Sequence, residues 1–279
     1  MWCREDNMVS VIVPLLFGLL FGGLPDDPVN GNISSEKESG KPAFRSVENN
    51  SFIAGEHLVF DLSYGIIKAG QGEMKIPEMT RINGRDAYRI QLTARSVSPF
   101  SWVYRVEDLW ETKVDKQGLF PWKFTERIRE GGYRRNTDVE FDHVNNKAIT
   151  KDGEYPVPEY VHDMVSAFYY VRTMDFDEFE PGDRVTLENF HRDSTYSLDV
   201  LYHGREEVSV KTGTFDTIMI EPLIKEGGLF KHEGAIFIWL TDDDLRVPVR
   251  MRTRVPVGSI TAELVRYSGL RDAIRARVQ

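Results

Sequence analysis

The stretch "HLVFDLSYGIIKAGQGEMKI", residues 57–76, decides how this chain is expected to fold. Its first half alternates apolar and polar residues, which is typical of a β-strand with one buried face. Glycines at 65, 70 and 72 flank "IIKA", and the sequence after them again reads as a strand. A phosphate-binding loop would need a lysine followed by serine or threonine and then a helix, and neither follows. We therefore expect a bent β-hairpin whose glycines allow a turn and a sharply coiled strand.

The same alternation continues almost to the C-terminus. "YRVEDLWETKV" (104–114) and "FDTIMIEPLI" (215–224) are two of about a dozen such segments, and glycine-containing turns such as "GG" at 131–132 separate them. Short alternating segments with turn residues between them are typical of antiparallel sheets. The sequence thus predicts a mainly β fold: a strongly curved antiparallel sheet, an open barrel or a sandwich of about a dozen strands.

One segment has a helical period instead. In "PEYVHDMVSAFYYVRTMDF" (158–176) apolar residues recur every three or four positions. This spacing predicts one amphipathic helix at about 161–174, with Phe168 buried at the centre of a stripe that covers a face or opening of the sheet. The stripe consists of Val161, Met164, Val165, Phe168 and Val171.

The N-terminal residues indicate export. Residues 9–24 are apolar and uncharged, but they are too few to cross a bilayer comfortably and Pro14 interrupts them. We predict a signal peptide or N-terminal hydrophobic segment at 1–24 and a place in the periplasm or cell envelope. Residues 9–24 would tether the protein to the membrane if they are not cleaved. Translation could begin at Met1 or Met8.

Composition divides the rest of the chain. Residues 25–51 are rich in Pro, Gly, Asn, Ser and charge, so we expect a disordered linker. Residues 52–270 then form a single β-rich domain, and 271–279 a short, solvated basic tail.

Three segments carry a family resemblance. "GEHLVFDLSYGIIKAGQGEMKI" (55–76), "DLWETKVDKQGLFPWKFTERIREGGYRR" (108–135) and "VHDMVSAFYYVR" (161–172) resemble the domain of unknown function 3108 family of exported bacterial proteins. The resemblance covers roughly residues 52–268. It implies a β-rich domain of the cell envelope, and it implies no catalytic residue.

Charge and cysteine content exclude several function classes. The net charge is −9, which argues against nucleic acid and against anionic membrane surfaces as partners of the molecule as a whole. The only cysteine, Cys3, precedes the apolar run, so the domain has no disulfide and no thiol nucleophile. We expect no metal and no cofactor, because no ligand motif is present.

The candidate catalytic residues are His162, Asp163 and His191. Asp163 stands where a helix N-cap belongs, and His191 lies in the polar turn "HRDS". Both positions therefore have a structural explanation. An envelope-polymer hydrolase or transferase that uses these three residues remains the alternative, and we predict no catalytic residue.

Arginines and aromatic residues supply the candidate binding site. Four arginines surround the 131–132 turn and suit a phosphate or a sulfated sugar, while nearby aromatic residues suit an apolar or sugar-stacking groove. We favour a non-enzymatic binding module for a lipid, a glycan or an envelope partner protein; the ligand's identity, the pathway and the oligomeric state stay open. The candidate residues are Trp102, Tyr104, Trp122, Arg127, Arg129, Arg134 and Arg135.

Overall fold

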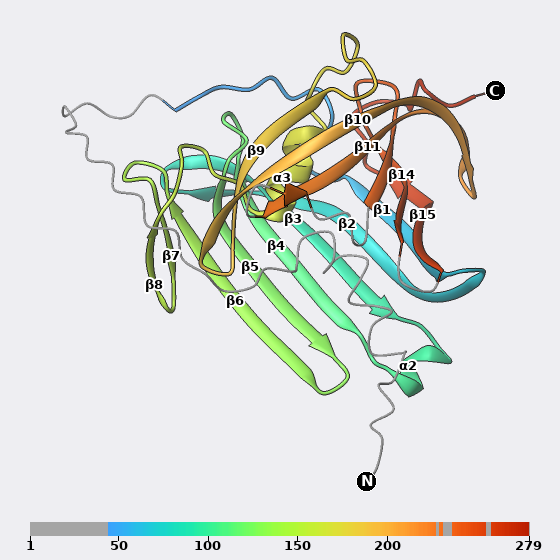
Figure 1. Cartoon of the computed structure of the whole chain (residues 1–279), viewed down its shortest axis with the longest axis horizontal. Helices are drawn as coiled ribbons and strands as arrows, with labels where there is room; N and C mark the ends of the chain where they lie inside the picture. The colour runs from blue at the N-terminus through green and yellow to red at the C-terminus, as the bar shows by residue number, and fades with distance from the viewer. Residues whose placement is uncertain (1–43, 227–228, 231–235, 255–257, 279) are drawn as a thin grey trace.

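The fold is a long, strongly curved antiparallel sheet (Figure 1). A computed structural model describes residues 44–226, 229–230, 236–254 and 258–278. Strands follow the order β8-β7-β6-β5-β4-β3-β2-β1-β15-β14-β13-β11-β10-β9, and β12 pairs with β11 off this path. Nearly every strand pairs with its neighbour in sequence, and the β1–β15 pair joins the two ends of the chain. The predicted mainly β fold with a curved antiparallel sheet is confirmed.

The strands have the following bounds. They are β1 His57–Tyr64, β2 Ile67–Ile82, β3 Arg85–Ser96, β4 Glu107–Asp115, β5 Pro121–Glu130, β6 Tyr133–Asp142, β7 Lys147–Thr150, β8 Gly153–Pro156, β9 Arg184–His191, β10 Ser194–Val210, β11 Gly213–Glu226, β12 Leu229–Phe230, β13 Ile236–Thr241, β14 Pro248–Arg254 and β15 Ser259–Ser268.

Helix α3, Met164–Val171, lies inside the curve of the sheet and is shorter than the predicted 161–174. The helix cannot begin earlier because Asp163 is its N-cap, and His162 before it pairs with Asn189 of β9. The predicted centre of the buried stripe was wrong. Tyr169 is fully buried, whereas Phe168 is only partly buried, because the sheet surrounds the helix instead of covering one face.

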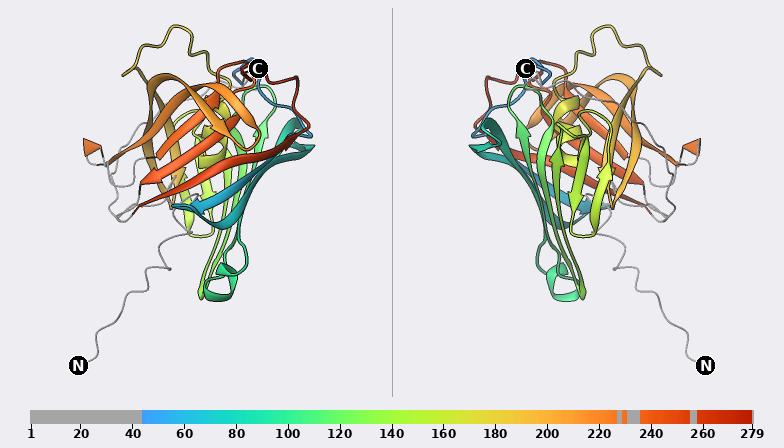
Figure 2. Two further views of the ribbon diagram at one scale, coloured as in Figure 1. Left: turned by 90° about the vertical axis from the view of Figure 1, so that its right-hand side faces the viewer. Right: turned by 90° about the vertical axis from the view of Figure 1, so that its left-hand side faces the viewer.

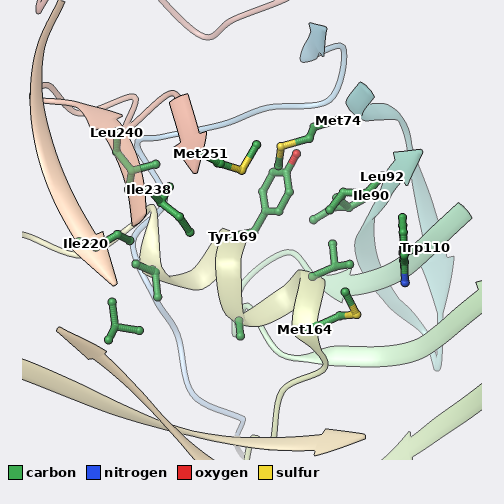
Figure 3. Close-up of a cluster of buried hydrophobic side chains, with 14 of the residues drawn as sticks. Met74, Ile90, Leu92, Trp110, Met164, Tyr169, Ile220, Ile238, Leu240 and Met251 are labelled. Carbon is green, nitrogen blue, oxygen red and sulfur yellow. The ribbon is translucent and has the colours of Figure 1, made fainter. Parts of the chain in front are cut away.

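Side chains of α3 fill the space between the two halves of the sheet (Figure 3). Tyr169 lies between Met74 on one side and Met251 on the other, and Met164 points toward the β3–β4 half. A hollow between α3 and strands β10, β11 and β13 measures about 20 Å³, which is room for one water molecule. The core is therefore packed through the middle of the curved sheet.

The two end strands of the sheet, β8 and β9, approach each other without pairing directly. The segment leading into α3 lies along β9: the His162 amide donates to Glu188 at 2.8 Å, and the Phe190 amide donates to His162 at 2.8 Å. Rings of Tyr155 on β8 and Phe190 on β9 are 5.8 Å apart. An extended segment thus covers the edge of β9, whose backbone groups would otherwise stay unpaired.

A buried ion pair fixes the C-terminal end of α3. Arg172 donates from Nη1 and Nη2 to the two carboxylate oxygens of Glu56 at 2.7 and 2.8 Å, and both side chains are fully buried. The remaining donors of Arg172 bind the carbonyl oxygens of Arg246 and Leu245, each at 3.1 Å. The hydroxyl of Tyr169 also donates to Glu56 at 3.3 Å. Every charge in this cluster is satisfied, as burial demands.

The 57–76 hairpin is present, but its turn is tighter than predicted. Only Gly65 and Ile66 connect β1 to β2, so most of "IIKA" belongs to the second strand. Gly70 lies within β2, where a Cβ atom would come within 2.8 Å of the Arg95 carbonyl oxygen on β3. The glycine therefore permits close approach of β2 and β3, and β2 carries a β-bulge at Ala69, opposite Leu62 and Ser63 of β1.

Both predicted boundaries of the domain need correction. Arg45 donates to the Gly118 carbonyl at 2.7 Å and Ser51 to the Arg172 carbonyl at 2.6 Å, so residues 44–51 pack on the domain and are not linker. The tail also packs, since Arg277 bridges to Phe215 on β11. The predicted segment 1–24 and the rest of the linker lie outside the described residues. Within the described part, no helix has the length and apolar character to cross a membrane.

Glu56→Ala should lower the free energy of unfolding by about 3–5 kcal/mol, because it leaves the buried guanidinium of Arg172 unpaired. Reversible urea unfolding measures the loss. Glu140→Ala is the control: Glu140 pairs with Lys123 on the exposed surface, and its removal should not change the unfolding midpoint measurably. A loss below about 1 kcal/mol for Glu56→Ala would contradict the role of this pair.

Candidate functional site

Antiparallel pairing brings three connections to one end of the sheet. These are the β1–β2 turn, the β3–β4 connection with helix α2 (Phe100–Val103), and the β5–β6 turn. The terminal pairs at this end are Tyr64 with Ile67, Arg95 with Glu107, and Glu130 with Tyr133. We call this end, residues 65–67, 95–107 and 129–136, the tip. Figure 2 shows α2 and the neighbouring strand ends projecting beyond the rest of the molecule.

Charged side chains cross the outer face of the tip in one row. Arg95 on β3 pairs with Glu107 on β4, and Arg129 on β5 pairs with Arg134 on β6. The Val106–Glu130 bridge places Glu107 opposite Arg129, so the row is continuous over four strands. Arg105 joins it by donating to Glu107 at 2.6 Å. We call these five residues the arginine row; it holds four exposed arginines and a single carboxylate.

The electrostatics of the row follow from this imbalance. The hydrogen bond from Arg105, with the charges of Arg129 and Arg95, holds the pKa of Glu107 below its usual value. Arg134 donates to the backbone carbonyls of Gly131 and Tyr133, at 2.9 and 2.8 Å, and not to a carboxylate. A shallow hollow of about 390 Å³ lies over the row, lined by Arg105, Glu107, Arg129, Gly131, Arg134 and Asn136.

The four predicted arginines therefore separate into two groups. Arg129 and Arg134 belong to the row. Arg127 binds both oxygens of Asp138, at 2.9 and 2.7 Å, and Arg135 on the inner face binds both oxygens of Glu126, at 2.8 and 2.9 Å. The sequence analysis did not identify Arg95 and Arg105, which reach the row only through strand pairing.

The three predicted aromatic residues also have different surroundings. Trp102 on α2 is 87% exposed. Tyr104 packs beneath the β5–β6 turn, where a Cβ atom on Gly131 would lie 2.8 Å from its ring; Gly131 has φ 51°, which a glycine adopts readily. Trp122 is buried at the opposite end of the sheet, with Nε1 donating to Asp115 at 3.2 Å. It lines a groove of about 930 Å³ beside the β2–β3 turn, away from the tip.

Two carboxyl groups share the inner face of the tip. Asp108 accepts a hydrogen bond from the Arg129 amide at 2.8 Å and is hydrogen-bonded to Glu130. Burial, with the adjacent charge of Asp108, raises the pKa of Glu130 to about 8. At neutral pH the pair therefore holds one proton and a single negative charge. The inner face adds little negative charge beneath the arginine row.

His162 and Asp163 form hydrogen bonds at the N-terminus of helix α3. Arg45 can only donate, so His162 Nε2 accepts from it at 3.2 Å and Nδ1 carries the proton toward Ser166 Oγ, also at 3.2 Å. Asp163 Oδ1 accepts from the amides of Val165 and Ser166, while Oδ2 accepts from Thr112 at 2.6 Å. Burial lowers the pKa of His162 well below its usual value and raises that of Asp163 to about 6.

His191, the third candidate catalytic residue, has different surroundings from His162 and Asp163. Burial lowers its pKa to about 4, and its charged neighbours are Glu126, Arg192 and Arg135. Its Nε2 has no hydrogen-bond partner. Among the described residues no hydrogen bond links it to His162 or Asp163, and no group of three or more His, Asp or Glu side chains could hold a metal ion.

Comparison with known proteins gives a family and a fold. The sequence model of a family described as "Protein of unknown function (DUF3108)" matches residues 59–265. None of the curated proteins matches the chain. A β-barrel-like protein of the domain of unknown function DUF1849 from Brucella abortus is similar in structure, with TM-score 0.50 and 11% identity over 78% of this chain and 98% of that one. This similarity supports the barrel-like curvature.

Two further solved structures are similar at lower scores. One is described as a "putative exported protein" with a YmcC-like fold from Bacteroides fragilis (TM-score 0.35, 12% identity, 81% of this chain and 100% of that one). The other is described as a "putative lipoprotein" from Parabacteroides distasonis (TM-score 0.37, 10% identity, 81% and 100%).

Glu130→Gln should stabilise the protein increasingly as the pH rises from about 4.5 to about 8, relative to the unchanged protein. Because the folded-state pKa lies above the unfolded value of 4.5, the stability that this carboxyl contributes is full at low pH and is lost as the pH passes through 8. The slope should stay below about 1.4 kcal/mol per pH unit, since one proton is involved and the site is partly solvated.

Urea unfolding of the unchanged protein and of Glu130→Gln over this pH range measures the difference in their free energies of unfolding. The contributions of the other titrating groups cancel in this difference. Glu140→Gln, at an exposed position, should give a flat difference. A flat difference for Glu130→Gln as well would show that Glu130 does not share a proton with Asp108.

Proposed function

The chain belongs to the DUF3108 family, whose description includes no activity, and from its geometry we propose that it is a non-enzymatic binding module of the cell envelope that holds an anionic ligand at the arginine row. The predicted signal at residues 1–24 supports export to the periplasm or envelope. Of the predicted ligands (lipid, glycan or envelope protein), the row favours those that carry phosphate, sulfate or carboxylate groups.

The like charges of the row are the observation that carries this proposal. Arg129 and Arg134 stand directly opposite each other on β5 and β6, an arrangement that destabilises an antiparallel pair. Glu107 is the single carboxylate among the four arginines, although the whole chain has net charge −9. An oxyanion bound across the row would relieve the repulsion and accept several charge-assisted hydrogen bonds.

The interior offers less to a ligand. The helix and its apolar neighbours fill the curved sheet, and the hollow beside α3 measures only about 20 Å³. His162 and Asp163 already have hydrogen-bond partners in the helix cap. These contacts support binding on the outer surface over hydrolase or transferase chemistry within.

Arg129→Gln with Arg134→Gln should abolish complementation of a deletion strain, because the two substitutions remove half of the positive charge of the row. Arg81→Gln with Lys116→Gln is the matched control. Both residues are exposed at the opposite end of the sheet, and Arg81 binds a turn carbonyl, that of Gly84, much as Arg134 binds that of Gly131. The control should complement fully at an equal protein level.

The triple variant His162→Gln, Asp163→Asn, His191→Gln tests the enzymatic alternative in the same assay. Asn keeps the oxygen that caps the helix, so we expect the variant to fold, and circular dichroism checks this. We expect this variant to complement. A folded but inactive triple variant, together with an active arginine variant, would replace the binding module with an enzyme.

A further inference from the structure

Exposed apolar side chains gather at the same end of the sheet as the arginine row. Among the described residues, the four most exposed large hydrophobic side chains are Ile66 (101%), Trp102 (87%), Ile67 (52%) and Tyr133 (51%). The next in order, Val144, is 38% exposed. Single exposed apolar residues are ordinary on protein surfaces. Four at one end are a pattern that marks an interaction surface.

Strand pairing, and not proximity in sequence, places these side chains at one end of the sheet. Ile66 and Ile67 belong to the β1–β2 turn, Trp102 to α2, and Tyr133 to the first position of β6. The start of β2 pairs with the end of β3, at Gly70 and Ser96, so the β1–β2 turn and the β3–β4 connection leave the same end of the sheet. In Figure 2 α2 and the neighbouring β5–β6 end project furthest, where a flat surface could reach them, and the β1–β2 turn lies to the side of this projection.

The chemistry of the tip fits a bilayer surface. Tryptophan and tyrosine prefer the headgroup level of a membrane, where the ring is apolar and its N–H or O–H stays hydrated. Arginine binds lipid phosphates and is favoured by anionic leaflets. The aliphatic side chains of Ile66 and Ile67 cannot stack on a sugar ring. They can be buried at the boundary between the lipid headgroups and the acyl chains.

Charge is also distributed asymmetrically along the molecule. Five carboxylates and no basic residue lie between Asp175 and Asp183, and three more follow at Asp242–Asp244. Arg205 binds Asp177 at 3.1 Å and Asp242 at 2.7 Å, so the two acidic segments are neighbours. Residues 242–244 follow β13 at the end of the sheet opposite the tip. Arg246 and Arg275 pair with Asp242 and Asp244 and offset part of this negative charge, so an anionic surface would favour the tip over this end.

We infer that the tip docks on the surface of a membrane that contains anionic phospholipid, with the arginine row at the lipid phosphates and with Trp102, Tyr133 and the Ile66–Ile67 turn in the interface. The inference rests on the proposed function of the row and names its ligand. Docking is peripheral: the sheet stays outside the bilayer, and only side chains of the tip enter it.

Vesicle co-sedimentation of the full exported protein tests the inference. The probes are vesicles of phosphatidylcholine alone and of phosphatidylcholine with phosphatidylglycerol. We expect binding to the second kind only, weakened by salt. Arg129→Gln with Arg134→Gln should reduce it about tenfold or more, since each basic residue near an anionic surface contributes a few-fold. Ile66→Ser with Trp102→Ala should reduce it at least about fivefold through lost apolar burial.

Arg81→Gln with Lys116→Gln, at the opposite end of the sheet, should bind as the unchanged protein does. A fluorescence measurement reports insertion separately: anionic vesicles should shift tryptophan emission to the blue, and Trp102→Phe should remove most of this shift while it retains binding. Each variant is first checked for an unchanged unfolding midpoint.

The outcomes separate this inference from the proposed function. Absence of binding to anionic vesicles, or equal binding by all variants, overturns the membrane inference. If the arginine variant still fails to complement in that case, the row binds a soluble anionic glycan or a partner protein, and the proposed function stands. If the arginine variant complements fully, the proposed function and the inference that rests on it both fail.

Discussion

The buried pair of Arg172 and Glu56 determines how the sheet can curve around its helix. A fully buried guanidinium is tolerated only where its donors are satisfied, and here a carboxylate and two backbone carbonyls satisfy them. These partners come from the approach to β1 and from the 242–247 connection, which are far apart in sequence. The end of α3 is therefore fixed to both halves of the sheet, and the strands must close around it.

Because side chains fill the interior of the curved sheet, the proposed binding surface lies on its outer face. Along β4, β5 and β6 alternate side chains face inward, so one face of each strand is used by the core and the other is free to carry charge. The inward residues Trp110 and Arg135 hold Glu126 beneath the sheet. The outward positions of the same strands supply Glu107, Arg129 and Arg134 of the arginine row. Stability and recognition are thus divided between the faces of the same three strands.

The alternating pattern predicts the sheet but leaves its three-dimensional details open. Phe168 and Tyr169 are both large and aromatic, so spacing alone does not decide which one the core contains once a sheet surrounds the helix. Trp102 and Trp122 likewise differ only in position, and their exposure depends on which end of the sheet projects. These choices are made by contacts between distant segments, which a local pattern does not contain.

The division of the arginines, in contrast, could have been predicted. A two-residue turn at 131–132 sets residue 130 opposite 133, and therefore 129 opposite 134 and 128 opposite 135. Arg134 and Arg135 must then face opposite sides of the sheet. Arg95 and Arg105 could not be placed this way, because their position in the row depends on the pairing of β3 with β4 and of β4 with β5.

The inner face of the tip explains how a row of like charges can exist on thin hairpins without its ligand. Glu126 lies behind it but is paired with Arg135, so the proton-sharing pair Asp108–Glu130 supplies the negative charge that offsets part of the repulsion through the sheet. Ionisation of Glu130 would add a second negative charge there and weaken the attraction of the tip for anions. Because burial keeps Glu130 protonated at neutral pH, the inner carboxylates offset only part of the positive charge of the row. The outer face therefore stays positive enough to bind an anion.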